Sequence, residues 1–312
     1  MIINTGGRTD TVQYYSRWLL NRFKEGFVYV RNPLFENKVT RYDLDPQKVD
    51  CVIFCSKNYE PILDRLEEIT SRFNTYFFYT ITAYGKDIEP GVPDIDKSID
   101  TLIKLEKIVG RDRIAWRYDP VLLTKKYTIQ QHMITFAHMA ARLSRHIACC
   151  IFSFVEYYRK VQFNMKELLL LSDEDMEELA QGLGEIAQKY KIRLKSCVSS
   201  KDYSRFGIEH SACVNLENLG RVNTVEFKNL KHTGMRRGCS CIASHDIGAY
   251  DSCPNGCKYC YANQSAEKAL ENFKDHKWES PILLGKLKES DEICQSKQVS
   301  YIKKQEIQLK LF

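Results

Sequence analysis

The sequence lacks a long hydrophobic run. No stretch of about 18 consecutive apolar residues occurs among its 312 residues, whereas a membrane-spanning helix needs roughly 20. The first residues read as a short strand followed by a glycine pair, without the apolar segment of a secretion signal. We therefore expect a cytoplasmic protein that has no membrane partner.

The sequence also lacks internal repeats, low-complexity linkers and a strong excess of one charge. The net charge is +6, with 44% hydrophobic and 28% charged residues, as in a globular protein. Because so modest a charge attracts polyanions only weakly, a small-molecule substrate is favoured over a nucleic acid. The densest basic cluster spans residues 228–237, and it leaves open a zinc-stabilised protein that binds nucleic acids or anions.

Cysteine, in contrast, is abundant, with twelve in the chain. Disulfide frameworks are typical of small secreted domains that lack a core, and a chain of 312 residues does not fit that class. The thiols are therefore expected to be reduced or to bind metal. Five cysteines are expected to bind no metal. Four of them are predicted to be small buried hydrophobes in strands: Cys51, Cys55, Cys149 and Cys150. The fifth, Cys294, is predicted to lie in a charged C-terminal helix.

Three cysteines are spaced as C-x3-C-x2-C, at Cys253, Cys257 and Cys260. Three thiolates can hold three irons of a 4Fe–4S cluster and leave the fourth iron open to bind and activate a small molecule. Zinc sites mostly use paired C-x2-C units, so structural zinc is the less favoured alternative. The spacing, with Tyr259 before the last cysteine, resembles that of radical S-adenosylmethionine (SAM) enzymes.

The resemblance implies that SAM binds the open iron and that the reduced cluster cleaves SAM to a 5′-deoxyadenosyl radical. It also implies an external electron donor such as flavodoxin or ferredoxin. Tyr259 or Tyr261 would stack on the adenine or pack within the fold. A non-enzymatic iron–sulfur redox protein, with four ligands on every cluster, is the main alternative.

Four more cysteines complete a possible second site: Cys197, Cys213, Cys239 and Cys241. Four thiolates suit a second, fully ligated 4Fe–4S cluster or an all-thiolate zinc ion, and unligated thiols remain the alternative. The sequence therefore predicts one 4Fe–4S cluster or two.

Short apolar runs alternate with helical patterns along the first 200 residues. Strands are predicted at 1–4, 51–55, 76–82, 114–117, 149–154 and 194–198, and helices at 10–22, 61–73, 95–109, 128–145 and 173–190. Such alternation predicts an α/β fold with a parallel sheet, closed into a full or partial TIM-type (β/α) barrel or, as second choice, open and doubly wound. A hairpin is expected at 27–44, and 201–312 is expected to form a cysteine-rich iron–sulfur extension packed on the mouth of the 1–200 barrel.

Polar side chains follow each predicted strand, and in a barrel these strand ends meet at one mouth. The candidate catalytic residues are Arg8, Asp10, Lys57, Arg117, Asp119 and Glu156. The cations among them would pair with the SAM carboxylate or an anionic substrate. The carboxylates would fix a ribose hydroxyl or move a proton. The alternative is that these residues only form ion pairs with one another.

The chain as a whole resembles a bacterial family, the domain of unknown function numbered eighteen-forty-eight. The resemblance covers about residues 1–265 and rests on the segments 8–10, 57–58, 84–90, 116–120, 238–241 and 246–248 together with the cysteine triplet. The cysteine cluster of that family looks like that of radical SAM enzymes. In those enzymes the triplet follows the first strand, whereas here it follows the sixth, which implies a permuted arrangement.

Overall fold

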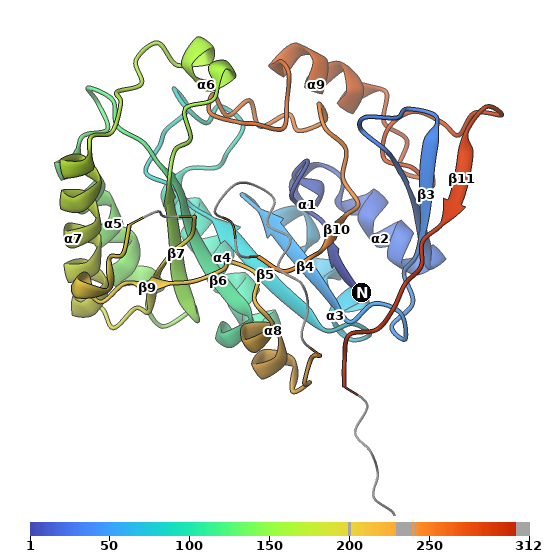
Figure 1. Cartoon of the computed structure of the whole chain (residues 1–312), viewed down its shortest axis with the longest axis horizontal. Helices are drawn as coiled ribbons and strands as arrows, with labels where there is room; N and C mark the ends of the chain where they lie inside the picture. The colour runs from blue at the N-terminus through green and yellow to red at the C-terminus, as the bar shows by residue number, and fades with distance from the viewer. Residues whose placement is uncertain (199–200, 229–238, 240, 304–312) are drawn as a thin grey trace, which may run out of the picture.

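The fold is built on one large parallel β-sheet with helices between successive strands (Figure 1). The computed structural model describes residues 1–198, 201–228, 239 and 241–303. Eight strands pair in the order β10-β1-β4-β5-β6-β7-β8-β9. Their bounds are β1 (Ile2–Asn4), β4 (Cys51–Ser56), β5 (Thr75–Thr80), β6 (Ile114–Val121), β7 (Cys149–Phe154), β8 (Leu194–Ser196), β9 (Glu209–His210) and β10 (His245–Asp246). The predicted α/β class with a parallel sheet is confirmed.

The sheet follows the strand order of a barrel but is not closed. Its strands succeed one another in chain order, and β10 returns beside β1 through the pairs Ile3–His245 and Asn4–Asp246. Within the described part of the chain, β9 pairs with β8 and no ladder joins β9 to β10. Each of these two edge strands has two residues, too few for a long ladder. The described residues therefore do not form the full TIM-type barrel of the sequence prediction.

One face of the sheet carries the main hydrophobic core and is covered by helices. They are α1 (Thr11–Tyr14), α2 (Ser16–Glu25), the 3-10 helix η1 (Glu60–Arg65), α3 (Glu67–Thr70), α4 (Ile95–Val109), α5 (Ile129–Leu143) and α7 (Asp173–Lys189). Trp116 of β6 points into this layer and stacks on Phe136 of α5, with ring centroids 4.9 Å apart. The side chains of Thr128 and Ser172 cap α5 and α7, so both helices begin close to their predicted positions.

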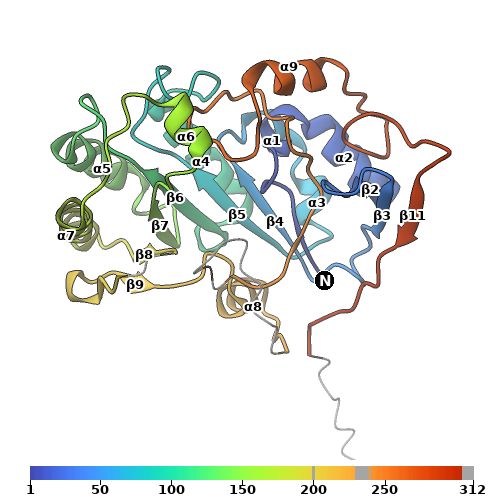
Figure 2. The same cartoon turned by 45° about the horizontal axis from the view of Figure 1, so that its top comes forward.

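The opposite face of the sheet carries a smaller core. Ile53 and Phe78 belong to it, together with Leu219 of α8 (Leu216–Asn223). At the start of β5, Thr75 N donates to Asn223 Oδ1 at 3.2 Å, so α8 covers the amino-terminal end of this face (Figure 2). The apolar layer therefore lies beneath the carboxyl ends of the strands.

The predicted helix over 10–22 is interrupted at Tyr15. α1 ends at Tyr14 and α2 begins at Ser16, because Tyr15 leaves the helical region with φ −128° and ψ 26°. The Tyr15 hydroxyl donates to the carbonyl oxygen of Ser252 at 2.5 Å, and its ring lies edge-on to that of His276. The interruption of the helix at Tyr15 is thus accompanied by contacts with residues far away in the chain, and the local sequence does not predict it.

A second sheet of three strands joins segments that lie far apart in the chain. β2 (Phe27–Arg31) and β3 (Lys38–Asp43) form the predicted hairpin, and β11 (Glu292–Gln295) pairs in parallel with β3. Cys294 lies in this exposed strand, so its expected position in a helix is wrong. Strands β9 and β10 come from beyond residue 200 and join the large sheet, while the division at residue 200 stays a prediction.

Two helices lie beyond the end of the sheet toward which the strands run. They are α6 (Arg159–Asn164) and α9 (Ala266–Lys274), both drawn at the top of Figure 1. Lys160 of α6 donates from Nζ to the carbonyl oxygen of Tyr261 at 2.9 Å, which ties α6 to the cysteine-rich loop. None of the helices among the described residues is both long and apolar enough to cross a membrane.

Candidate functional site

The cysteine triplet lies on a loop that rests on segments following β1 and β5. Tyr14, after β1, donates its hydroxyl to Asn255 Oδ1 at 3.1 Å. After β5, Gly91 N donates to Asn255 O at 2.8 Å, and Ile88 O accepts from Lys258 N at 3.0 Å. The loop is therefore fixed over the carboxyl ends of the parallel strands, where α/β sheets bind their ligands.

Two features hold this loop closed and close to the sheet. A Cβ atom on Gly91 would lie 2.8 Å from Asn255 Cα, so a glycine permits the close approach. Asn263 Nδ2 donates to the carbonyl oxygen of Cys253 at 2.7 Å, and Cys253 N donates to Asn263 Oδ1 at 3.4 Å. The Asn263 amide thus bridges the base of the loop and fixes the first of its three cysteines.

Burial makes the first two thiols of the loop hard to ionise unless a cation is present. Burial and the nearby Asp10 raise the pKa of Cys253 to about 12, and burial together with Glu89 raises the pKa of Cys257 well above its ordinary value. A metal that replaces the protons would remove this penalty. Among the described residues, the sulfurs of Cys253, Cys257 and Cys260 do not all lie within 4.8 Å of one another. That spread suits a cluster in which each iron takes one thiolate better than it suits a single ion.

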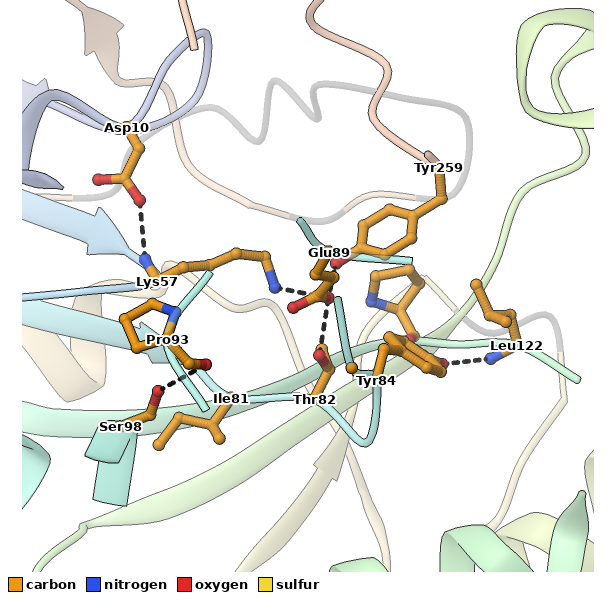
Figure 3. Close-up of polar contacts among 12 residues, drawn as sticks. Asp10, Lys57, Ile81, Thr82, Tyr84, Glu89, Pro93, Ser98, Leu122 and Tyr259 are labelled. Carbon is orange, nitrogen blue, oxygen red and sulfur yellow. Dashed lines mark hydrogen bonds and ion pairs between the residues drawn. The ribbon is translucent and has the colours of Figure 1, made fainter. Parts of the chain in front are cut away.

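Glu89 connects the polar groups beneath this loop (Figure 3). It is 2% exposed, and its Oε1 accepts from Lys57 Nζ at 2.9 Å and from Thr82 Oγ1 at 2.7 Å. The hydroxyl of Tyr259 also donates to this oxygen. Burial by itself would lower the pKa of Lys57, but Glu89 and Cys257 raise it above its ordinary value. Lys57 therefore stays protonated as a fixed cation beside the thiols.

The sequence predictions miss Glu89 as a site residue and include its segment, 84–90, only as a family motif. A signal was available, because Glu89 is a carboxylate in the loop after a parallel strand, like Asp10 after β1. Its partner Lys57 follows a different strand, so the pairing itself is visible only in the fold.

Asp10 is bound on both of its carboxylate oxygens by the chain itself. Its Oδ1 accepts from Gln13 N at 3.0 Å and from Ser56 Oγ at 2.6 Å, and its Oδ2 accepts from Lys57 N at 2.9 Å. Burial raises the pKa of Asp10, and these hydrogen bonds offset part of that rise. The carboxylate ties the start of α1 to the end of β4 and so positions Lys57.

A second polar cluster lies on β6 and β7, where Arg117 and Asp119 fall inside β6 and not after it as predicted. The fold brings the predicted residues Arg117 and Asp119 together as an ion pair. Ser153 of β7 donates its hydroxyl to Asp119, and Arg117 Nη1 donates to Cys55 Sγ at 3.4 Å. Cys55 is thus a neighbour of charged groups and is only partly a core residue.

Three further predicted residues have separate surroundings. The guanidinium carbon of Arg8 lies 5.4 Å from the centroid of the Tyr250 ring, and Arg8 Nε is buried without a hydrogen-bond partner. Glu156, after β7, accepts from the hydroxyl of Tyr158. Tyr261 is 58% exposed, and its hydroxyl donates to a backbone carbonyl after β1. Tyr261 therefore offers an exposed aromatic ring beside the triplet.

The structure brings together three of the four cysteines of the predicted second group. Cys197 follows β8, Cys213 follows β9 and Cys241 precedes β10, and their sulfurs all lie within 4.8 Å of one another. Cys239 belongs to the described residues but lies outside this group. Hydrogen bonds from Cys213 and Cys241 lower the pKa of Cys197, and the nearby Arg117 acts in the same direction. We call these three residues the thiol triad.

A family model with the description domain of unknown function (DUF1848) matches residues 2–262. The chain belongs to this family. The resemblance of the sequence to this family is thereby confirmed. No curated protein and no solved structure matches the chain significantly.

The part of the chain that matches DUF1848 contains all eight strands of the large sheet, the triplet and the thiol triad. Strand β11 and helix α9 lie beyond it. The basic cluster 228–237, on which the nucleic-acid alternative depends, falls outside the described residues except for Lys228.

Proposed function

We propose that this DUF1848 protein is a radical SAM-type iron–sulfur enzyme with a small-molecule substrate. The observation that carries the proposal is the position of the triplet. Cys253, Cys257 and Cys260 lie on one loop fixed over the carboxyl ends of parallel strands, beside the Lys57–Glu89 ion pair. Such strand ends are the usual ligand site of α/β sheets.

The residues of the triplet fit a 4Fe–4S cluster in three respects. They are three soft thiol ligands, their sulfurs do not all lie within 4.8 Å of one another, and burial opposes the ionisation of Cys253 and Cys257 in the absence of metal. When bound, such a cluster would supply one reducing electron for the cleavage of SAM to methionine and a carbon radical. The proposal therefore requires an external one-electron donor of the flavodoxin or ferredoxin type.

The chain's own side chains would bind and orient the reactants. Lys57, held protonated by Glu89, provides a positive charge next to the thiolates and to an anionic ligand. The Arg117–Asp119 pair provides a cation and an acceptor nearby. Arg8 has a buried Nε that lacks a partner and is a second candidate for a carboxylate. The exposed ring of Tyr261 suits an adenine.

The sheet would shield this chemistry from water. Beneath the strand ends lies the smaller apolar core, to which Ile53 and Phe78 belong. A dry layer there would protect a carbon radical and strengthen the nearby charge interactions. We further propose that the sheet represents a partial TIM-type barrel, because its strands keep chain order and β10 returns to β1.

Anaerobic reconstitution of the full chain tests the proposal. We expect bound iron and sulfide, and an EPR signal of the reduced protein that changes when SAM is added. The variant Cys257→Ala should lose this signal, whereas Cys294→Ala, which removes an exposed cysteine of β11, should keep it. A protein that takes up zinc but no iron, or a cluster whose spectrum ignores SAM, would contradict the proposal.

A further inference from the structure

We propose that Cys197, Cys213 and Cys241 bind a single thiophilic divalent cation, zinc by preference, and leave one coordination position for an exchangeable ligand. This site is distinct from the triplet and does not depend on the function proposed above. The sequence favours a second 4Fe–4S cluster for this cysteine group, and the spacing of the sulfurs leads to a different conclusion.

The separation of the sulfurs is that of ligands around one ion. At a zinc–sulfur bond length of about 2.3 Å, two thiolates on one ion lie at most about 4.6 Å apart, and tetrahedral angles place them about 3.8 Å apart. The three sulfurs of the triad all lie within 4.8 Å of one another. A cubane cluster binds each thiolate at a different iron and so spreads its ligands more widely. The triad therefore fits one ion, and the wider triplet does not.

The sheet positions the three ligands through backbone pairing. Cys197 N donates to the carbonyl oxygen of Phe152 in β7 at 3.0 Å. Ile242 N donates to Val214 O at 3.2 Å, and Val214 N donates to the Cys241 sulfur at 3.5 Å. An amide that donates to a sulfur stabilises the thiolate form and orients the ligand, as outer-sphere partners of metal sites do. The sulfurs thus converge because β7 fixes the Cys197 segment and the Cys213 and Cys241 segments are hydrogen-bonded to each other.

The surroundings favour a metal over unligated thiols. Free cysteines often serve as small buried hydrophobes, and Cys149 in the same core is of that kind. Hydrophobic packing alone does not require three sulfurs from separate segments to meet at one point. Three thiolates around a divalent cation carry one net negative charge, and the guanidinium of Arg117 lies within electrostatic range of Cys197 and Cys213. Because Arg117 is also paired with Asp119, its charge offsets only part of the negative charge of the site.

The number of protein ligands indicates the fourth position. Among the described residues, no fourth cysteine, histidine or carboxylate joins the group, and Cys239 lies outside it. Structural zinc sites are closed by four protein ligands, whereas sites with three keep a position for water or a substrate atom. We expect an anionic or sulfur-bearing small molecule to bind there, because such donors suit a thiophilic ion next to an arginine.

Cobalt(II) titration of the full chain, with zinc competition, tests the site. One equivalent should give the thiolate-to-cobalt absorption and the visible bands of a tetrahedral ion, and zinc should abolish them. The variant Cys241→Ser should weaken zinc binding by more than the roughly 100-fold loss typical of an outer-sphere partner. Cys149→Ala, a buried cysteine of the same core, and Cys257→Ala, which breaks the triplet, should each retain one equivalent.

Several results would overturn the proposal. One is four irons retained by the Cys257→Ala variant after reconstitution, which would show a second cluster. Another is cobalt binding lost with Cys257→Ala instead of Cys241→Ser. Loss of zinc in Cys239→Ser would show a closed four-thiolate site and refute the open position. If Cys241→Ser does not fold, alkylation of the wild-type protein decides: zinc should protect Cys213 and leave Cys294 reactive, and equal labelling of Cys213 with and without zinc would refute the site.

Discussion

The two cysteine groups of this protein are built in opposite ways. The triplet comes from eight consecutive residues, 253–260, on one loop. The thiol triad comes from three segments that meet only because β8, β9 and β10 place them together. The sulfurs of the assembled group all lie within 4.8 Å of one another, whereas those of the local group do not. The number of residues between cysteines therefore indicates that a metal site exists, whereas the distances between their sulfur atoms indicate which metal group the site binds.

The attachment of each group to the sheet also differs, and substitutions can separate the two. Besides backbone hydrogen bonds to the segment after β5, the triplet loop is held from beneath by Glu89, which accepts from the Tyr259 hydroxyl and is paired with Lys57. The triad depends on backbone hydrogen bonds of its own strands. Substitutions of Glu89 or Lys57 should therefore reduce iron binding by the triplet and leave zinc binding by the triad unchanged.

The largest effect is expected from Glu89→Gln. The substitution leaves the buried cation of Lys57 without its counter-charge, and breaking a buried ion pair in this way costs about 3–5 kcal/mol. Urea unfolding should show this loss. The control is Glu60→Gln, since the Glu60–Lys104 pair is exposed to solvent and should contribute little to stability. Similar losses for both variants would mean that Glu89 does not hold the site together.

A lower pH should reduce the stability of the whole fold through His132 of α5, which is buried against Tyr118 and Leu122. Burial lowers the pKa of His132 to about 4; its Nδ1 accepts from the Tyr118 hydroxyl, and its Nε2 donates to the Leu122 carbonyl oxygen. Because the folded pKa lies below the unfolded value of 6.5, the stability is fully present above pH 6.5 and is lost as the pH falls toward 4. The free energy of unfolding is expected to fall by about 3 kcal/mol over this pH range.

Urea unfolding between pH 7.5 and about 4.5 measures this dependence. The variant His132→Gln should have a shallower pH profile than the wild-type protein, because it removes the titrating group. Parallel profiles for the two proteins would show that His132 is not the cause.

A smaller effect is expected from Gly91→Ala. The added methyl group would lie 2.8 Å from Asn255 Cα and must push the triplet loop away from the sheet. Overpacking of this kind costs about 1–3 kcal/mol. We expect less iron to be retained after reconstitution and an unchanged cobalt titration of the triad. Equal loss at both sites would show that the two groups are mechanically coupled.

The smallest effect is expected from Tyr14→Phe, which removes the hydrogen bond from Tyr14 to Asn255 at 3.1 Å. Such a bond contributes about 1 kcal/mol. Differential scanning calorimetry should register a small decrease in the unfolding temperature, with iron content close to that of the wild-type protein. A loss as large as that of Glu89→Gln would place the main support of the loop at Tyr14 instead.

The sequence predicted the long buried strands well because each is a continuous apolar run, as in β5 and β7. It did not predict β9 and β10, since two residues carry no periodicity. The break at Tyr15 and the strand around Cys294 depend on partners far away in the chain. The search for polar residues at the ends of predicted strands identified Lys57 and Arg117 as candidates. Their ion-pair partners and the convergence of the triad are visible only in the three-dimensional structure.

The pairing of β3 with β11 has a consequence for the synthesis of the protein on the ribosome. About 250 residues separate these strands, which corresponds to roughly 10–50 s of translation. Throughout that interval the β2–β3 hairpin has an open edge, and an isolated hairpin is marginally stable and prone to wrong pairing. Lys38, Arg41 and Asp43 place charges along that edge. These charges thus disfavour aggregation of the nascent chain until β11 has been synthesised and pairs with β3.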